Sequence, residues 1–379
     1  MTRLIVFALV LASCASPSAA PSASPTPAAS ATAFTPSPTV ASSPTVAATS
    51  SPVAADPSRY GYVLSSNGRV VVRPERSTDA VIATGGEQPA ASPDGKRIAF
   101  WRTGPQGNNE QELRIVDVPG GAERMLRSIP VTSVGGSIVW SNDSTGLLYA
   151  FHSRESFPGV GGGPRFSMLE SFDLSTTQAS VEGSGELRLT SGAVFVPLSW
   201  DKAGLLSTAL VTGEGGMGRS YVTWDRRVQP AGQSSVKFTQ FPWSVVADTV
   251  QASYDAKRML AIDLAANVLR VWPVGDIAAA GMVGPGSAKL SDARWRLGTP
   301  ADIAWVVDNN VGVFTYQGAA QRIIHRGNAT VRIMSWRADG SGLVLNEMGR
   351  VNFIVDLSSG QATELSDFGG FIAGAVLLR

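Results

Sequence analysis

A recurring hairpin pattern constrains this 379-residue chain more than any other feature. The clearest copy is QPAASPDGKRIAFWR, residues 88–102, in which the turn Ser92-Pro93-Asp94-Gly95 precedes an apolar strand. Pro93 presets φ, Asp94 accepts hydrogen bonds from nearby backbone N–H groups, and Gly95 tolerates a positive φ. The stretch therefore predicts a β-hairpin whose second strand is buried.

Further copies align on the aspartate of the turn, and in each an apolar residue follows that aspartate by four positions. The aligned aspartates are Asp94, Asp143, Asp201, Asp255 and Asp339. Their spacings are 49, 58, 54 and 84 residues, and the last is twice 42, so a degenerate copy should lie inside it. Residues 293–308, ARWRLGTPADIAWVVD, fit that position, with Gly298-Thr299-Pro300 making the turn.

Each hairpin is followed by two further strand-like segments, which gives four strands per repeat unit. Six units are complete between residues 88 and 370. Residues 60–86 supply three strands that lack an inner strand, and residues 371–379 supply one strand that nothing follows. We expect these two ends to pair as a seventh unit, because the pairing removes an exposed sheet edge.

The repeat resembles that of the TolB-type, WD-like β-propellers. The resemblance covers residues 60–379 and implies an all-β, seven-bladed β-propeller of four-stranded antiparallel blades, with the ring closed by the C-terminal strand. Six or eight blades, a two-sheet sandwich, or several small β domains are the alternatives, although the last two do not account for the turn aspartates. The family's usual role implies that this propeller is a platform for protein contacts. The resemblance does not imply the peptidase activity that some relatives of the family have.

The first 13 residues predict a lipoprotein signal peptide. The apolar run of residues 4–12 is too short to span a bilayer. Leu11-Ala12-Ser13-Cys14 resembles a bacterial lipobox, and Cys14 is the only cysteine of the chain. We therefore expect lipidation of Cys14, attachment to a membrane, and an extracytoplasmic location in a bacterial cell envelope. A plain signal peptide with an incidental cysteine is the alternative.

The composition of the remaining residues predicts two regions, a tether and a folded domain. Residues 14–56 predict a disordered tether, because they are almost wholly Ala, Ser, Pro and Thr and residues 15–55 carry no charge. Residues 57–379 predict one β-propeller domain, since each unit buries its apolar faces only against its neighbours. The net charge of +1 gives no indication of a nucleic-acid partner.

Residues suited to catalysis are few. His152 and His325 are the only histidines, and they fall in different units. A His-rich metal site is therefore excluded, and a Ser-His-Asp triad would depend on one of these two residues. Both are interpreted as ordinary strand or loop residues. We predict no catalytic residue, no metal and no cofactor.

Long insertions between the second and third strands occur in three consecutive units, at residues 103–111, 153–165 and 212–219. In a propeller these loops emerge on the same face as the connections between blades, so we expect them to form one binding patch. Its candidate residues are Arg154, Glu155, Phe157, Arg165, Phe166, Glu214 and Arg219.

Three functions remain open from the sequence. The first is a non-enzymatic, lipid-anchored propeller that binds a protein or an envelope polymer. The second is a propeller hydrolase or lyase acting on a glycan or peptide, which clustered carboxylates in the central channel would favour. The third is a small-ligand sensor, which a deep apolar pocket would favour.

Overall fold

The computed structural model describes residues 59–378 with gaps, and the chain divides into residues 1–51 and residues 52–379. The gaps are residues 78, 105–109, 156–165, 186–193, 202–204, 214–218, 229–233, 244, 246–248, 285, 287, 300, 319–320, 349–351 and 366–370. The described strands form seven four-stranded antiparallel sheets. In this part of the chain, no helix has the length and apolar character needed to cross a membrane.

One sheet joins the two ends of the described chain. In spatial order it contains β28 (Phe371–Leu377), β1 (Tyr60–Ser66), β2 (Arg69–Pro74) and β3 (Ile82–Gly85). The terminal strand β28 pairs antiparallel with β1, from Leu377 opposite Tyr60 to Phe371 opposite Ser65. The pairing that the sequence predicts between the two ends is therefore present.

The other sheets each consist of four strands that are consecutive in the chain. The next two sheets contain β4 (Glu87–Ala91), β5 (Arg97–Thr103), β6 (Gln111–Asp117) and β7 (Glu123–Ile129), and then β8 (Ser133–Trp140), β9 (Gly146–Ser153), β10 (Ser167–Asp173) and β11 (Gln178–Gly185). The following sheet contains β12 (Val194–Asp201), β13 (Leu205–Gly213), β14 (Arg219–Val228) and β15 (Ser234–Gln240).

The last three sheets complete the order. They contain β16 (Gln251–Ala252), β17 (Arg258–Asp263), β18 (Val268–Pro273) and β19 (Gly281–Val283), then β20 (Leu290–Trp295), β21 (Asp302–Val307), β22 (Asn310–Thr315) and β23 (Arg322–Arg326), and finally β24 (Val331–Trp336), β25 (Gly342–Glu347), β26 (Asn352–Asp356) and β27 (Ala362–Glu364). A short 3-10 helix, η3 (Ile277–Ala279), lies between β18 and β19.

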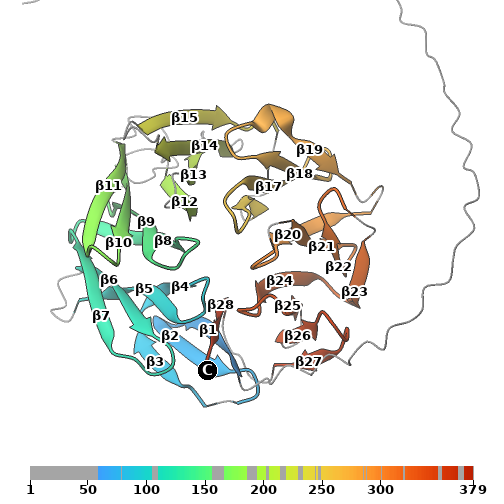
Figure 1. The fold of residues 1–379 in the computed structure, drawn as a ribbon, viewed down its shortest axis with the longest axis horizontal. Helices are drawn as coiled ribbons and strands as arrows, with labels where there is room; N and C mark the ends of the chain where they lie inside the picture. The colour runs from blue at the N-terminus through green and yellow to red at the C-terminus, as the bar shows by residue number, and fades with distance from the viewer. Residues whose placement is uncertain are drawn as a thin grey trace, which may run out of the picture. The chain divides into compact units, whose positions relative to one another are not determined.

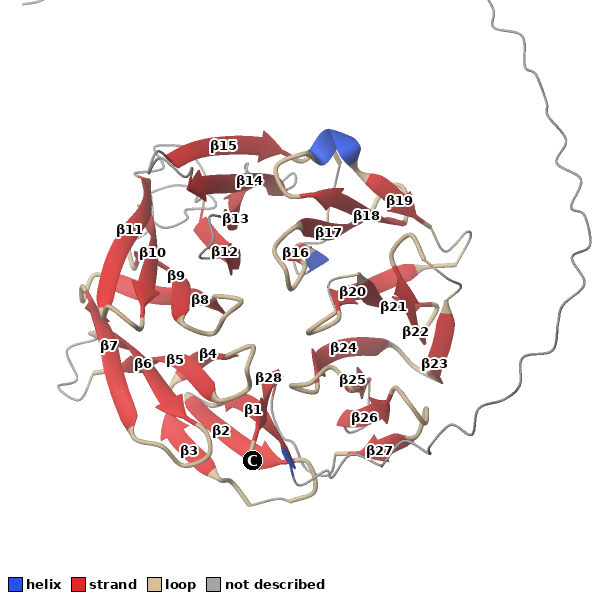
Figure 2. Cartoon of the chain, viewed as in Figure 1, coloured by secondary structure: helices blue, strands red, loops and turns tan. Residues whose placement is uncertain are grey.

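The sheets of residues 52–379 stand around a common centre (Figures 1 and 2). The strands nearest the centre are β28, β4, β8, β12, β16, β20 and β24. From β4 to β24, each of these inner strands contacts the next one, and β28 contacts both β4 and β24. This radial arrangement of four-stranded sheets is the β-propeller architecture.

Three of the predicted turns share a Ser-x-Asp arrangement. In one of them, buried Ser141 donates its hydroxyl to Asp143 Oδ1 at 2.6 Å, and Asp143 Oδ1 accepts the N–H of Thr145 at 3.0 Å. Ser141 Oγ also accepts the N–H of Gly146 at 2.9 Å. The same contacts recur in the Ser92–Asp94 and Ser253–Asp255 turns. In all three turns the aspartate accepts a backbone N–H, and the serine is a partner that the sequence pattern did not predict.

The remaining turns depart from this arrangement. In the last hairpin Arg337 replaces the serine, and Asp339 accepts the N–H of Ser341 at 2.9 Å and the hydroxyl of Tyr60 at 2.6 Å. Asp201 was predicted in the turn itself, but it is the last residue of β12, because the pairing with β13 extends to Leu205. Its side chain lies outside the described residues.

The degenerate copy forms the predicted hairpin of β20 and β21. Its turn contains Gly298 at a φ of 74°, and the N–H of Thr299 donates to the carbonyl of Arg296 at 3.4 Å. Arg296 also forms an ion pair of 3.0 Å with Asp302. Pro300 lies outside the described residues.

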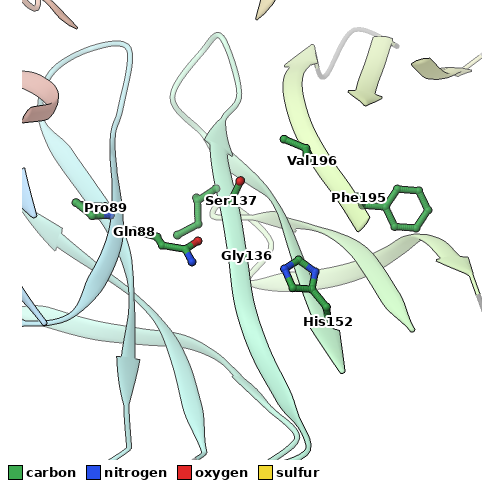
Figure 3. A pocket seen from close by; sticks show the side chains of 8 residues that line it. Gln88, Pro89, Gly136, Ser137, His152, Phe195 and Val196 are labelled. Carbon is green, nitrogen blue, oxygen red and sulfur yellow. The ribbon is translucent and has the colours of Figure 1, made fainter. Parts of the chain in front are cut away.

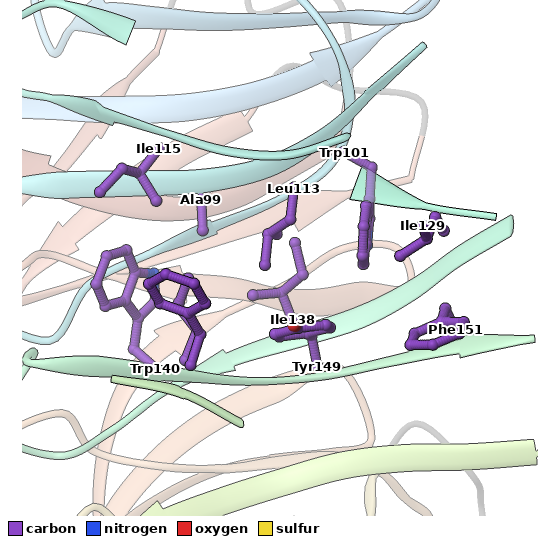
Figure 4. Packing of buried hydrophobic residues seen from close by; sticks show 11 residues of the cluster. Ala99, Trp101, Leu113, Ile115, Ile129, Ile138, Trp140, Tyr149 and Phe151 are labelled. Atoms are coloured by element: carbon purple, nitrogen blue, oxygen red, sulfur yellow. The ribbon is translucent and has the colours of Figure 1, made fainter. Parts of the chain in front are cut away.

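Apolar cores fill the space between adjacent sheets, and Figure 4 shows the one between the β4–β7 and β8–β11 sheets. In this core the buried rings of Trp101 and Tyr149 meet edge to face, with centroids 5.7 Å apart. The consecutive residues Ile98 to Trp101 on β5 are all buried. A strand covered on both faces needs a continuous apolar run, which is the pattern that the repeat carries.

A buried ionic network links the β28–β1–β2–β3 sheet to the β24–β27 sheet. The guanidinium of Arg337 donates to Glu75 at 2.7 and 3.1 Å and to Asp356 at 3.0 Å. Glu75 also accepts the hydroxyl of Tyr62 at 2.9 Å, and Arg337 lies 4.9 Å from the centre of the Tyr60 ring. Burial and the charge of Glu75 raise the pKa of Tyr62 well above its ordinary value. The network therefore joins residues of two neighbouring sheets that are far apart in the sequence.

Candidate functional site

Two of the predicted long loops contact the end of β7 or the connection that follows it. The loop between β5 and β6 is closed by a bond of 2.7 Å from the N–H of Gly104 to the carbonyl of Glu110. The Glu110 carboxylate accepts the hydroxyl of Ser128 on β7. The N–H of Arg154, after β9, donates to the carbonyl of Thr132 in the connection at 2.7 Å. These contacts place both loops on one face, which we call the loop face.

The predicted binding residues are only partly brought together on this face. Arg154 and Glu155 are exposed. Phe166 is half-buried and packs against the core of Figure 4, so it anchors the loop more than it presents a surface. Phe157, Arg165 and Glu214 lie outside the described residues, and for Arg219 only the backbone, at the start of β14, is described.

Beside these loops, the inner strands β4 and β8 each contain a β-bulge. On β4, Glu87 pairs with Trp101 and Ala90 with Ala99, so one extra residue is accommodated between them. On β8 the same shift lies between Gly135 and Ile138. Bulges turn side chains out of the regular alternation of a strand, and they often occur next to functional sites.

Polar contacts from neighbouring strands hold the β8 bulge in place. The N–H of Gly135 donates to Oε1 of Gln111 at 2.6 Å, and Trp101 Nε1 donates to the carbonyl of Gly136 at 2.7 Å. Gln88 Nε2 donates to the carbonyl of Gly135 at 3.3 Å. A Cβ on Gly135 would lie 2.2 Å from the Trp101 ring, so this position requires glycine for close approach.

The bulged residues line a cavity of about 440 Å³ on the loop face, shown in Figure 3. Its lining consists of Gln88, Pro89, Gly136, Ser137, Ile138, His152, Phe195 and Val196. These residues come from β4, β8, β9 and β12, so three neighbouring sheets build the wall. The volume falls within the range of roughly 300–1,000 Å³ that is usual for small-molecule pockets.

His152 is the one titratable group in this lining, and burial lowers its pKa. Its Nδ1 lies 3.4 Å from Oγ of Ser167, and that oxygen accepts the N–H of Phe195 at 2.9 Å. The Ser167 hydroxyl can donate its hydrogen to Nδ1 or accept one from it, according to the tautomer of the ring. The interpretation of His152 as an ordinary strand residue missed its place in the cavity; the Gly135-Gly136 pair is the only sequence signal near it.

A second cavity, of about 370 Å³, lies along the inner strands on the side of the hairpin turns. Its wall comes from β4, β8, β24 and β28 and from the turns after β4 and β20. It is lined by Pro89, Ala90, Ala91, Ser92, Pro93, Ile138, Val139, Trp140, Leu297, Ser335, Trp336, Ala373, Gly374 and Ala375. Trp140 and Trp336 supply its largest side chains, and both are more than nine-tenths buried. The cavity is predominantly apolar.

No family model matches the chain, and no curated protein matches it. Solved structures do resemble it. The β-propeller domain of the Trilobed protease from Pyrococcus furiosus is 14% identical, with a TM-score of 0.51 over 80% of this chain and 88% of that chain. That propeller is described as having an open velcro topology, whereas β28 pairs with β1 here.

Two further solved structures show the same likeness. A functionally unknown protein from Desulfotomaculum acetoxidans is 10% identical, with a TM-score of 0.54 over 85% of this chain and 99% of that chain. Oligogalacturonate lyase from Vibrio parahaemolyticus is 10% identical, with a TM-score of 0.54 over 76% of this chain and 84% of that chain. At such identities the likeness establishes the fold alone. The predicted all-β propeller class is thus confirmed.

Proposed function

We propose that this protein is a non-enzymatic, lipid-anchored extracytoplasmic β-propeller that binds a protein or an envelope polymer through its loop face. The observation that carries the proposal is that one long loop contacts the end of β7 through Ser128–Glu110, and a second contacts the following connection through Arg154–Thr132. Loops held by a rigid scaffold are common carriers of binding residues. The exposed charges of Arg154 and Glu155 beside the loop-face cavity supply the polar contacts that such a surface uses.

We also infer that the described sheets are the seven blades of a closed ring. The inference is supported by the pairing of β28 with β1 and by the contacts of β28 with both β4 and β24. In a closed ring the inner strand of the first blade comes from the C-terminus of the chain. Both chain ends then share one sheet, and the edge of β1 is covered.

The membrane anchor in this proposal is Cys14. A diacylglyceryl group together with an N-terminal acyl chain provides the multi-chain anchoring that a single chain does not. Cys14→Ala should therefore move the protein to the soluble fraction or leave an uncleaved precursor. Unchanged membrane fractionation of the Cys14→Ala protein would remove the lipid anchor from the proposal.

The binding face is tested by crosslinking in the cell. A photo-reactive amino acid would replace Glu155 on the loop face or, as the matched control, Lys96 in the β4–β5 turn, at the opposite end of the neighbouring sheet; both positions are exposed. We expect a discrete adduct from position 155 that Arg154→Glu diminishes, and little adduct from position 96. The same adduct from position 96, at equal or greater yield, would place binding on the turn side instead.

A further inference from the structure

The two cavities adjoin each other along β4 and β8. Pro89 on β4 and Ile138 on β8 line both of them. One cavity reaches the loop face and the other extends along the inner strands toward the hairpin turns. We call the two together the β4–β8 passage.

The chemical character of the passage changes along its length. At the loop face its wall carries hydrogen-bonding groups from Gln88, Ser137 and His152. Toward the turns it is bounded by the side chains of Trp140 and Trp336 and by the small or apolar residues around them. A ligand that fills it therefore needs a polar end and an apolar end.

The described residues that line the passage carry no fixed charge. Among the residues that line the two cavities in the described part of the chain, none is Asp, Glu, Lys or Arg. Burial lowers the pKa of the His152 ring and so favours its neutral form. An ionic group that entered would lose hydration without gaining a partner of opposite charge, which is strongly unfavourable.

The bulges make the polar end of the passage. Gln88 and Pro89 fall within the β4 bulge, and Gly136 and Ser137 fall within the β8 bulge, so all four lie outside the regular ladder pairing. These same four residues line the loop-face cavity. Ser137 is exposed to it, although the neighbouring residues Gly136 and Ile138 are buried. The irregular backbone is thus the feature that gives this part of the wall its hydrogen-bonding groups.

We propose that the β4–β8 passage binds a small uncharged amphiphile, with its apolar chain along Trp140 and Trp336 and its hydrogen-bonding head at Ser137 and His152. This inference goes beyond the proposed function and stands without it. A small-ligand site of this kind is the feature that the third functional alternative requires.

The test uses two small probes that share one chain and differ in head group, n-hexyl β-D-glucopyranoside and n-hexyl sulfate. Each would be titrated as a monomer into the full chain carrying Cys14→Ser, and tryptophan fluorescence would report binding because Trp140 and Trp336 line the passage. We expect saturable binding of the glucoside and affinity for the sulfate that is weaker by about tenfold or more.

Two variants and one control variant test which residues bind the probes. Ser137→Lys adds a cation at an exposed position that tolerates the side chain, and it should reverse the preference toward the sulfate. Ala373→Leu narrows the apolar cavity and should weaken glucoside binding, whereas Ala83→Leu, on an exposed position of β3, should not. No saturable glucoside response, equal affinity for the two probes, or indifference to both Ser137→Lys and Ala373→Leu would overturn the proposal. Crosslinking from position 155 tests only binding at the loop face. Its outcome is therefore independent of the test of ligand binding in the β4–β8 passage.

Discussion

Arg337 and Glu75 form a buried ion pair that links the sheet containing β1 and β28 to the β24–β27 sheet. They lie 262 positions apart in sequence, yet their charged groups meet at 2.7 Å with less than a tenth of either residue exposed. Tyr62 and Asp356 complete the hydrogen bonding of the pair. A buried charge that keeps its partners is tolerated, whereas one that loses a partner is costly.

Removing one member of this pair should therefore destabilise the whole propeller. Arg337→Ala leaves the Glu75 carboxylate buried without its cation, and we expect a loss of about 3–5 kcal/mol in the free energy of unfolding. The double variant Arg337→Met, Glu75→Leu should recover much of that loss. Urea unfolding of both proteins measures the difference; an Arg337→Ala midpoint equal to that of the parent would show that the network adds nothing.

Acid should weaken the same junction through Asp356. Burial raises the pKa of this carboxyl, but hydrogen bonds from Ser358 and Ser359 outweigh it and bring the pKa from 3.8 to about 2. A carboxyl whose folded pKa is lowered stabilises the fold above its unfolded pKa and loses that contribution as the pH falls through the folded value. We expect stability to fall from about pH 4 to about pH 2, and less steeply in Asp356→Asn. Identical acid-unfolding curves would contradict this assignment.

At the scale of the element, the hairpins followed from local sequence and the bulges did not. A turn such as Ser92 to Gly95 can be predicted from local sequence, because its side chains form hydrogen bonds with groups only a few residues away. The bulge of β8 instead depends on Gln111 and Trp101, which belong to another sheet. The sequence around β8 does not show which residues of another sheet will contact it, so the bulge could not be predicted.

The candidate site also has one part that could be predicted from local sequence and one part that could not. The long loops were visible as insertions, so the face that carries Arg154 and Glu155 could be predicted. The cavity beside them could not, because it arises where bulges on β4 and β8 displace Gln88 and Ser137 from regular pairing. His152 consequently appeared ordinary in the sequence although it lines that cavity.

The β8 bulge should be sensitive to one added methyl group. In Gly135→Ala the new Cβ would lie 2.2 Å from the buried Trp101 ring, so the ring or the strand must shift. We expect a loss of about 1–3 kcal/mol in the free energy of unfolding. Gly85→Ala on β3 is the matched control, because nothing lies within 4 Å of its added Cβ. Equal thermal stability of the two variants would mean that the bulge accommodates a side chain.

At the scale of the whole molecule, we propose a ring that is closed by pairing β28 with β1. The C-terminal strand β28 contributes Ala373, Gly374 and Ala375 to the second cavity, on the side of the hairpin turns, and contacts both β4 and β24. Deleting residues 371–379 would uncover the edge of β1 and the faces of two neighbouring sheets. We expect the truncated chain to lose its single cooperative unfolding transition.

The most direct measurement restores the deleted strand at the other end of the chain. Tyr60 lies opposite Leu377 in the β1–β28 ladder, so residues 371–379 can be moved to precede Tyr60 through a short turn such as that of residues 92–96. In the relocated order the inner strand comes first, as in every other sheet. Calorimetry would then compare the unfolding transitions of the parent, truncated and relocated chains. Closure predicts one cooperative transition in the parent and relocated chains and its loss in the truncated chain, whereas a truncated chain that unfolds like the parent would contradict it.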